Sequence, residues 1–147
     1  MYQYTMSTYV CGFVEISSLD EADLTTEGAW QSCLDIGSLG LGLGAESEIL
    51  FGATKHKLEW VPLAQNRGLP PNLGALTSHA AKDVLADQTG WGFTYITYEE
   101  IEQVDWRAYP TAELDGSTYG WGLLFRLMQT LDSGSKHQRL VVWFEWF

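Results

Sequence analysis

The chain has 147 residues, of which 46% are hydrophobic and 18% are charged, so it can fold around one buried core. Eight Lys and Arg stand against nineteen Asp and Glu, giving a net charge of −11. This balance excludes a general affinity for nucleic-acid phosphates, which requires cations along one face. It favours solubility, a basic protein partner or imitation of nucleic acid. We treat residues 1–147 as a single domain.

The sequence predicts neither export nor membrane insertion. The N-terminal segment MYQYTMSTYV lacks a basic region followed by an apolar stretch, and no run of roughly 18 apolar residues is present. Cys11 and Cys33 are the only cysteines, and their spacing indicates neither a disulfide framework nor a zinc site. We therefore expect a cytoplasmic protein without a cofactor.

The first part of the chain predicts one strand followed by short helices. Residues 7–16 are rich in β-branched and aromatic types, which favours a strand. The acidic segment 17–28 is expected to form a loop that leads into a short helix over 29–36. The glycine-rich segment 37–44 predicts a flexible connection, and 45–51 predicts one or two helical turns.

The middle of the chain predicts a proline-rich stretch, a helix and a strand. Three prolines between 62 and 71 exclude long regular structure there. Residues 76–86 have helical composition, with Thr77 or Ser78 as the expected cap. The aromatic and β-branched segment 93–96 favours a strand.

The last third of the chain carries the clearest local signals. Thr97 and Glu100 have the spacing of a capping box, which predicts a helix that continues to about Trp106. Apolar residues repeat at three and four positions within 119–131, which indicates a helix. The segment 139–147 is apolar on both faces apart from one glutamate, as in a central strand covered on both sides or packed at an interface.

Together these elements predict an α+β domain. Its mixed or antiparallel sheet should have the N- and C-terminal strands at or near its centre, with the helices packed on it. The apolar ending WFEWF has no polar tail, so we also expect either a central position for this strand or a homo-oligomer that covers it.

Several segments from residue 45 onward resemble a family of small bacterial and phage proteins with no established activity. The segments are AESEILFG, the pair Lys55 and Lys57, WVPLAQNRGLPPNL, WGFTYITYEEIEQVDW and RLVVWFEW. The match is most specific at the RGLP sequence, 67–70, at the strand–helix junction that ends in Asp105-Trp106, and at the terminal strand. Where the family often has His-Ser, this chain has Trp91-Gly92, so any chemistry of that histidine would be absent or changed.

Three of the eight Lys and Arg residues, and one of the three histidines, gather in one turn-rich stretch. The cluster consists of Lys55, His56, Lys57 and Arg67. In a functional interpretation, Arg67 grips a phosphate or carboxylate while the backbone at Gly68 approaches the ligand closely. In a structural interpretation, Arg67 pairs with an acidic side chain such as Asp105 or caps carbonyl groups of the loop. The sequence leaves both interpretations open.

Aromatic residues flanked by glycine form a second candidate site. Trp91, Tyr95, Tyr119 and Trp121 could stack a flat ligand because the neighbouring glycines let backbone approach it. The competing interpretation is an aromatic core in which glycine makes room for the rings.

The sequence contains no recognisable catalytic or metal-binding constellation. Ser78 and His79 are adjacent on a predicted helix, where their side chains diverge by about 100°. The glycine run 40–44 lacks the strand and βαβ setting of a dinucleotide-binding fingerprint. The carboxylates at 99–102 are explained by a helix cap and solvent, and no histidine spacing predicts a metal site.

These patterns favour a non-catalytic binding protein that captures a small anionic, nucleotide-derived ligand. The phage members of the resembled family suggest a counter-defence sponge for an immune signal. An acidic interaction or inhibitor module that docks on a basic partner is the alternative, and a hydrolase with a non-standard site is the third. An Arg67 locked in an internal salt bridge without a cavity beside it would favour the docking module.

Overall fold

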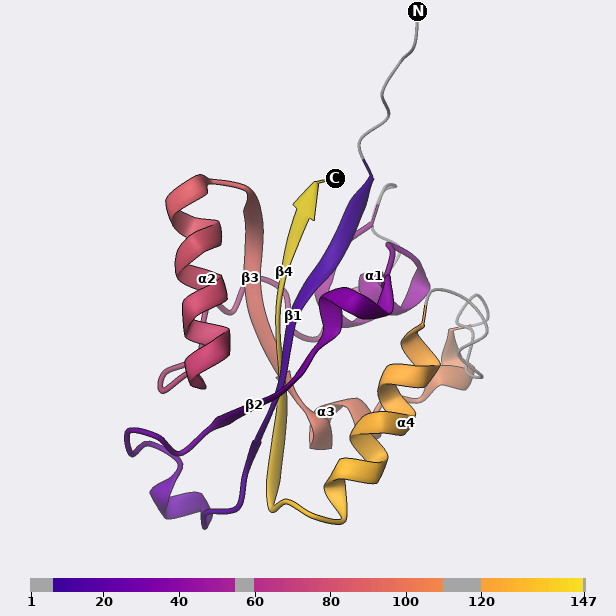
Figure 1. Ribbon diagram of the computed structural model, residues 1–147. Coiled ribbons are helices and arrows are strands. Elements are labelled where there is room, and N and C mark those ends of the chain that lie inside the picture. The colour runs from indigo at the N-terminus through magenta and orange to yellow at the C-terminus, as the bar shows by residue number, and fades with distance from the viewer. Residues whose placement is uncertain (1–6, 55–59, 110–119, 147) are drawn as a thin grey trace, which may run out of the picture.

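The computed structural model describes residues 7–54, 60–109 and 120–146 (Figure 1). Four strands form its centre: β1 (Thr8–Ser17), β2 (Gln31–Asp35), β3 (Gly90–Thr97) and β4 (His137–Trp146). They build one sheet in the order β2-β1-β4-β3, and every neighbouring pair is antiparallel. The first and last strands are thus the two central ones.

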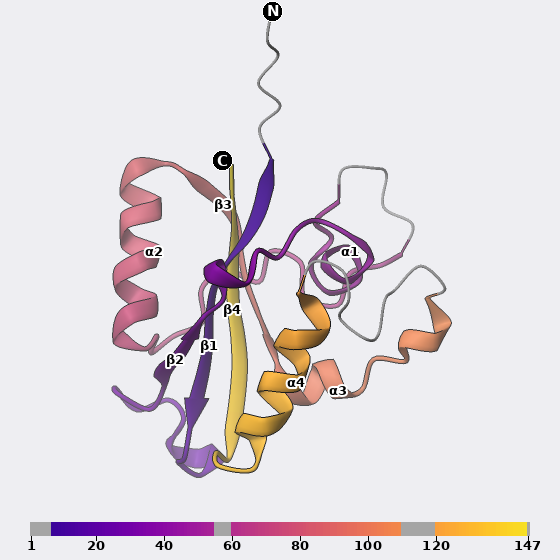
Figure 2. The same ribbon diagram turned by 45° about the vertical axis from the view of Figure 1, so that its right-hand side comes forward.

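Helices cover both faces of this sheet. They are α1 (Ala45–Phe51), α2 (Ala75–Asp87), α3 (Tyr98–Glu102) and α4 (Trp121–Asp132). With the sheet seen almost edge-on, α2 lies alone on one side, while α1, α3 and α4 lie on the other (Figure 2). The prediction of an α+β domain with central terminal strands is confirmed.

The apolar pattern of β4 follows from this central position. It pairs with β1 along its whole length, from His137 opposite Ser17 to Trp146 opposite Thr8, and with β3 on its other side. Alternate side chains of a strand point to opposite faces. Both faces are covered by helices, so both sets of β4 side chains are buried from Leu140 to Phe144.

The two faces carry cores of unequal size. The larger core joins β1, β3 and β4 to α1, α3 and α4 and includes Leu50, Trp121 and Met128. The smaller core lies under α2 and comprises Phe13, Ala81, Val84, Val141 and Trp143.

The helix α2 touches the sheet through a narrow stripe. Only Thr77, Ala81 and Val84 are buried on it, while Leu76 is 63% exposed and Leu85 is 53% exposed. Because one thin stripe cannot cover four strands, part of the α2 face of the sheet is left open beside β1 and β2.

A buried ion pair anchors the chain just before α2. Glu15 and Arg139 lie opposite each other on β1 and β4, and Arg139 Nε donates to Glu15 Oε1 at 2.8 Å. The second carboxylate oxygen of Glu15 accepts from Gly74 N at 2.6 Å. Arg139 Nη2 also donates to the carbonyl oxygens of Pro71 and Asn72. The pair therefore fixes the proline turn and the first residue before the helix.

The predicted helix over 29–36 is wrong, because residues 31–35 form the edge strand β2. Its backbone pairs with β1, with a register irregularity between Val14 and Glu15. Leu34 packs against the larger core on one face, and Ser32 hydrogen-bonds to Thr77 on the other. Cross-strand pairing has overridden local composition here.

The predicted caps have mixed outcomes. The capping box is confirmed: Thr97 Oγ1 accepts from Glu100 N at 3.2 Å, and Glu100 Oε1 accepts from Thr97 N at 3.1 Å. The helix ends at Glu102, however, and a separate 3-10 turn occupies 106–108. The expected cap of α2 at 77 or 78 is wrong, since α2 starts directly after Gly74.

Within the described part of the chain, no helix combines the length and the apolar character that crossing a bilayer would require.

Candidate functional site

The guanidinium of Arg67 is engaged by the protein itself. Nη1 and Nη2 donate to the two carboxylate oxygens of Glu100 at 2.8 and 2.7 Å. The same two nitrogens donate to the carbonyl oxygens of Tyr95 and Leu63, and the group lies 5.6 Å from the centre of the Tyr95 ring. An anion that contacted both Nη atoms would have to displace Glu100, so the anion site at Arg67 stays a prediction.

The ion pair shifts the pKa of both partners. The hydrogen bond from Arg67 holds the pKa of Glu100 at about 2, below its ordinary value of 4.5. The hydrogen bond with Glu100 raises the pKa of Arg67. Both side chains are partly exposed, so solvent weakens the attraction. This ion pair fits the structural interpretation of Arg67. Its acidic partner is Glu100, whereas the sequence suggested Asp105.

The backbone of the RGLP sequence is tied to β3. Gly68 N donates to Phe93 O at 2.9 Å, and Arg67 N donates to Thr94 Oγ1 at 3.1 Å. The φ angle of Gly68 is 83°, a value that glycine adopts without strain. These contacts give Gly68 a role in holding the loop against the irregular part of β3.

The predicted aromatic residues lie in different parts of the molecule. Trp91, on β3, is 36% exposed and stacks on Trp146 with ring centroids 4.0 Å apart. Tyr95 lies beside Arg67 at the edge of the smaller core. Trp121 is fully buried, and its Nε1 donates to Gly42 O at 3.2 Å. A ligand could reach the Trp121 ring only if the larger core opened.

The remaining predicted site residues are Lys55, His56, Lys57 and Tyr119, which lie outside the described residues. Of the predicted set, the structure therefore brings together Arg67, Gly68 and Tyr95, while Trp91 and Trp121 lie apart from them.

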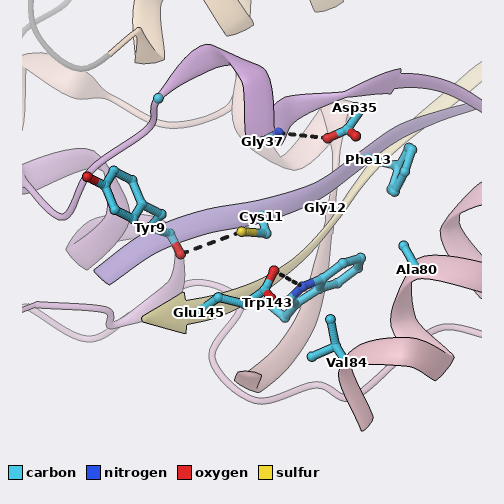
Figure 3. A pocket seen from close by; sticks show the side chains of 11 residues that line it. Tyr9, Cys11, Gly12, Phe13, Asp35, Gly37, Ala80, Val84, Trp143 and Glu145 are labelled. Atoms are coloured by element: carbon cyan, nitrogen blue, oxygen red, sulfur yellow. Dashed lines mark hydrogen bonds between the residues drawn. The ribbon is translucent and has the colours of Figure 1, made fainter. Parts of the chain in front are cut away.

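A hollow in the described part of the chain lies on the α2 face of the sheet (Figure 3). It has a volume of about 600 Å³, and we call it the α2 pocket. Cys11 and Phe13 of β1 and Trp143 of β4 line it from the sheet, Val84 lines it from α2, and Asp35 lies at the end of β2. The narrow contact of α2 with the sheet leaves this space.

Two carboxylates line the α2 pocket from opposite sides of β1. Asp35, on β2, is paired with Phe13, and Glu145, on β4, is paired with Tyr9. Asp35 Oδ1 accepts from Gly37 N at 2.9 Å, and Glu145 Oε2 accepts from Trp143 Nε1 at 3.1 Å. None of the described residues that line the pocket is Lys, Arg or His. The pocket is therefore apolar at its floor and acidic at two edges.

Cys11 is not prepared for nucleophilic chemistry. Burial raises the pKa of its thiol well above the ordinary value. A hydrogen bond with Glu145 and the negative charges of Glu145 and Asp35 raise it further. Because the thiolate is the reactive form, Cys11 stays an unreactive thiol at neutral pH.

A second hollow extends the α2 pocket along β2. It has a volume of about 300 Å³ and shares Phe13, Asp35 and Ala80 with the first. It continues towards Leu76 on α2 and Cys33 on β2. We call the two hollows together the α2 groove. It runs between α2 and the strands β1, β2 and β4, and His79 of α2 also lines its second hollow.

Within the described ranges, no three His, Cys, Asp or Glu side chains are grouped as they would be to hold a metal ion. Comparisons with family models, with curated proteins and with solved structures found no match. The resemblance to the bacterial and phage family therefore stays a prediction.

Sequence reasoning missed the residues of the buried ion pair and of the α2 groove. One signal was present: Glu15 and Glu145 are each the one acidic residue of a largely apolar strand. A carboxylate between apolar residues of a strand needs a partner or a solvent-exposed edge. Glu15 has found a partner in Arg139, whereas Glu145 lies at the pocket.

Proposed function

We propose that the protein is an acidic interaction module, and that the α2 groove docks on a basic segment of a partner protein. The observation that carries this proposal is the charge of the groove: Asp35 and Glu145 line the α2 pocket without a described basic residue among its lining. The net charge of −11 extends the negative potential beyond the groove and steers basic partners towards it.

The position of Arg67 also supports this role over the capture of an anion. The guanidinium that the sequence offered for an anion is occupied by Glu100, and none of the hollows described here is lined by Arg67. The groove instead combines an apolar floor with separated carboxylates. A peptide with apolar side chains and spaced cations complements such a surface.

A random-peptide display library tests the proposal directly. We expect the enriched peptides to be basic and their affinity to fall as salt is raised from about 0.1 M to about 1 M, because the screening length shrinks from about 10 Å to about 3 Å. Enrichment of neutral or acidic peptides, or of none, would refute the docking module.

A pair of matched variants locates the binding surface. Asp35→Asn with Glu145→Gln removes two charges from the groove but keeps an acceptor for Gly37 N and for Trp143 Nε1. Glu27→Gln with Glu99→Gln removes two exposed charges elsewhere. We expect the groove variant to lose about tenfold in affinity or more and the control less than about threefold. Equal losses would show that only the net charge matters.

A further inference from the structure

A separate hollow lies at the start of β4, beside α3 and the last residue of α4, two helices on the side of the sheet opposite to α2 (Figure 2). It has a volume of about 300 Å³, and we call it the α3–α4 hollow. Gln138 of β4, Asp132 at the end of α4, and Glu99 and Glu102 of α3 belong to its lining. It shares no lining residue with the α2 groove.

One buried oxygen atom in this lining lacks a hydrogen-bond donor. Gln138 is 4% exposed, and its Nε2 donates to Met128 O at 2.7 Å. This contact fixes the orientation of the amide, because a flipped amide would place two carbonyl oxygens against each other. Among the described residues, none donates to Gln138 Oε1. A buried acceptor without a donor is costly, so a donor that reaches it is favoured.

Two strong donors that line the hollow are engaged elsewhere. Lys136 Nζ donates to Asp20 Oδ1 at 2.6 Å. Burial raises the pKa of Tyr98 to about 12, and a hydrogen bond with Glu102 adds to this effect, so the Tyr98 hydroxyl keeps its proton and is used by Glu102. A bound molecule can therefore supply the donor that Gln138 lacks.

The rim of the hollow is negatively charged. Its basic residues are Lys136 and His137. The hydrogen bond from Lys136 lowers the pKa of Asp20, and the charge of His137 adds to this effect, so both basic residues act on that aspartate. The exposed carboxylates of the rim come from the 3-10 turn 21–23, from α3 and from the end of α4, and are those of Glu21, Glu99, Glu102 and Asp132. Carboxylates on three separate segments suit a cation that carries more than one charge.

We infer that the α3–α4 hollow binds a small aliphatic diamine, one ammonium group of which donates to Gln138 Oε1 and pairs with Asp132. Gln138 Nε2 also donates to Asp132 Oδ1 at 3.5 Å, so this carboxylate adjoins the amide. A primary ammonium has three N–H donors and can serve both groups at once. The second ammonium, at the other end of the alkyl chain, pairs with the carboxylates of α3.

Binding requires a small local movement. Gln138 Oε1 is covered in this structure, so side chains of the rim have to move aside before a donor reaches it. Asp132, Glu99 and Glu102 are exposed, and exposed side chains change rotamer within nanoseconds. The site does not depend on the docking function proposed for the α2 groove.

The test uses butane-1,4-diamine as the probe, titrated into the full chain. Calorimetry gives the affinity, and the side-chain amide of Gln138, assigned through its bonds to the backbone, is the local reporter in a nitrogen–proton correlation spectrum. We expect saturable binding that shifts this amide, and none with the neutral butane-1,4-diol. The diamine with both nitrogens fully methylated keeps its charges but has no N–H, and should bind at least about fivefold more weakly.

Two matched variants locate the site. Asp132→Asn with Glu102→Gln removes two charges from the rim but keeps their acceptor oxygens, and should weaken the diamine about fivefold or more. Glu27→Gln with Asp87→Asn removes two exposed charges at positions that line none of the hollows described above. This control should change the affinity less than about twofold.

Each other outcome overturns the inference. If the unmodified protein does not bind the diamine saturably, the hollow is no amine site and Gln138 Oε1 is left to water. Equal binding of the methylated diamine shows that Gln138 receives no donor. Equal losses in the two variants show attraction by the net charge only. Equal binding of N-acetyl-lysine methylamide, which carries one ammonium, overturns the diamine in favour of a lysine side chain of another protein. None of these results bears on the docking tests, because the two sites share no lining residue.

Discussion

Replacing Glu15 by glutamine measures what the buried ion pair contributes to the fold. Glu15 is fully buried and Arg139 nearly so. Burial lowers the pKa of Arg139, and the Glu15 carboxylate opposes that effect. In the folded protein the two oxygens of Glu15 serve two donors, Arg139 Nε and Gly74 N. Glutamine has the same shape but only one acceptor oxygen.

The magnitude follows from that mismatch. With one oxygen and one amide NH₂, the new side chain must turn its own donor towards either Arg139 Nε or Gly74 N, and that donor loses its partner. Losing a hydrogen bond to a charged group costs about 1.5–3 kcal/mol, and leaving a buried charge without its counter-ion costs about 3–5 kcal/mol. Arg139 retains the carbonyl oxygens of Pro71 and Asn72, so we expect a loss of about 3 kcal/mol.

Urea unfolding followed by tryptophan fluorescence is the assay. With a slope of about 2 kcal/mol per molar urea, a loss of about 3 kcal/mol lowers the midpoint by about 1.5 M. Glu27→Gln, at an exposed position, is the control and should change stability by less than about 0.5 kcal/mol. The double variant Glu15→Leu with Arg139→Met removes both charges and should lose less than Glu15→Gln alone.

A loss below about 1 kcal/mol at an unchanged slope would refute this reasoning, because the charge of Glu15 would then be dispensable to Arg139. A double variant that is less stable than Glu15→Gln would show that packing, and not the unpaired charge, decides the cost.

Three further predictions concern single contacts, each measured by urea unfolding. Gly12→Ala should destabilise the fold by about 2 kcal/mol or more, because φ is 139° and the new methyl group would overlap the carbonyl oxygen of Val141; a stable variant would contradict this. Thr97→Ala should cost about 1 kcal/mol by removing the cap of α3, and Thr97→Ser, which keeps the hydroxyl, should cost less. The pKa of Glu100 is lowered to about 2 from 4.5, so its pair with Arg67 stabilises the fold fully above about pH 4.5 and loses this effect as pH falls towards 2. Glu100→Gln should flatten that part of the pH profile, and an unchanged profile would exclude the pair as its cause.

Local sequence signals sufficed for the centre of the fold. The run from Leu140 to Phe144 is apolar on both faces because helices cover both sides of β4, and that pattern is readable without coordinates. The capping box at Thr97 and Glu100 was readable for the same reason, since it is formed by residues three apart. Signals of this kind depend only on near neighbours in the chain.

The edge strand β2 could not be recognised in this way. Its five residues, QSCLD, carry no strong strand composition, and their conformation is decided by pairing with β1. The acidic partner of Arg67 could not be predicted either, because the contact joins residues that are distant in the sequence. Glu100 and Asp105 are close to each other but both are far from Arg67 in the chain. Asp105 Oδ1 accepts from Arg107 N in the 3-10 turn, whereas Glu100 forms the ion pair with Arg67.

The α2 groove could not be predicted from the sequence, for a further reason. The groove exists because α2 buries only Thr77, Ala81 and Val84 against the sheet. The position of a helix on a sheet depends on packing across the whole face. Glu145 was visible as the one acidic residue in its strand, but nothing local to it indicates that Asp35 lines the same space.

The stacked pair of Trp91 and Trp146 gives the molecule an optical reporter of its own. Two indoles with centroids 4.0 Å apart and an interplanar angle of 29° couple their excited states, and such coupling produces paired circular-dichroism bands of opposite sign. Trp91 lies at the start of β3 and Trp146 at the end of β4, directly after Glu145. Fraying of this end of the sheet will change the intensity of those bands without any label.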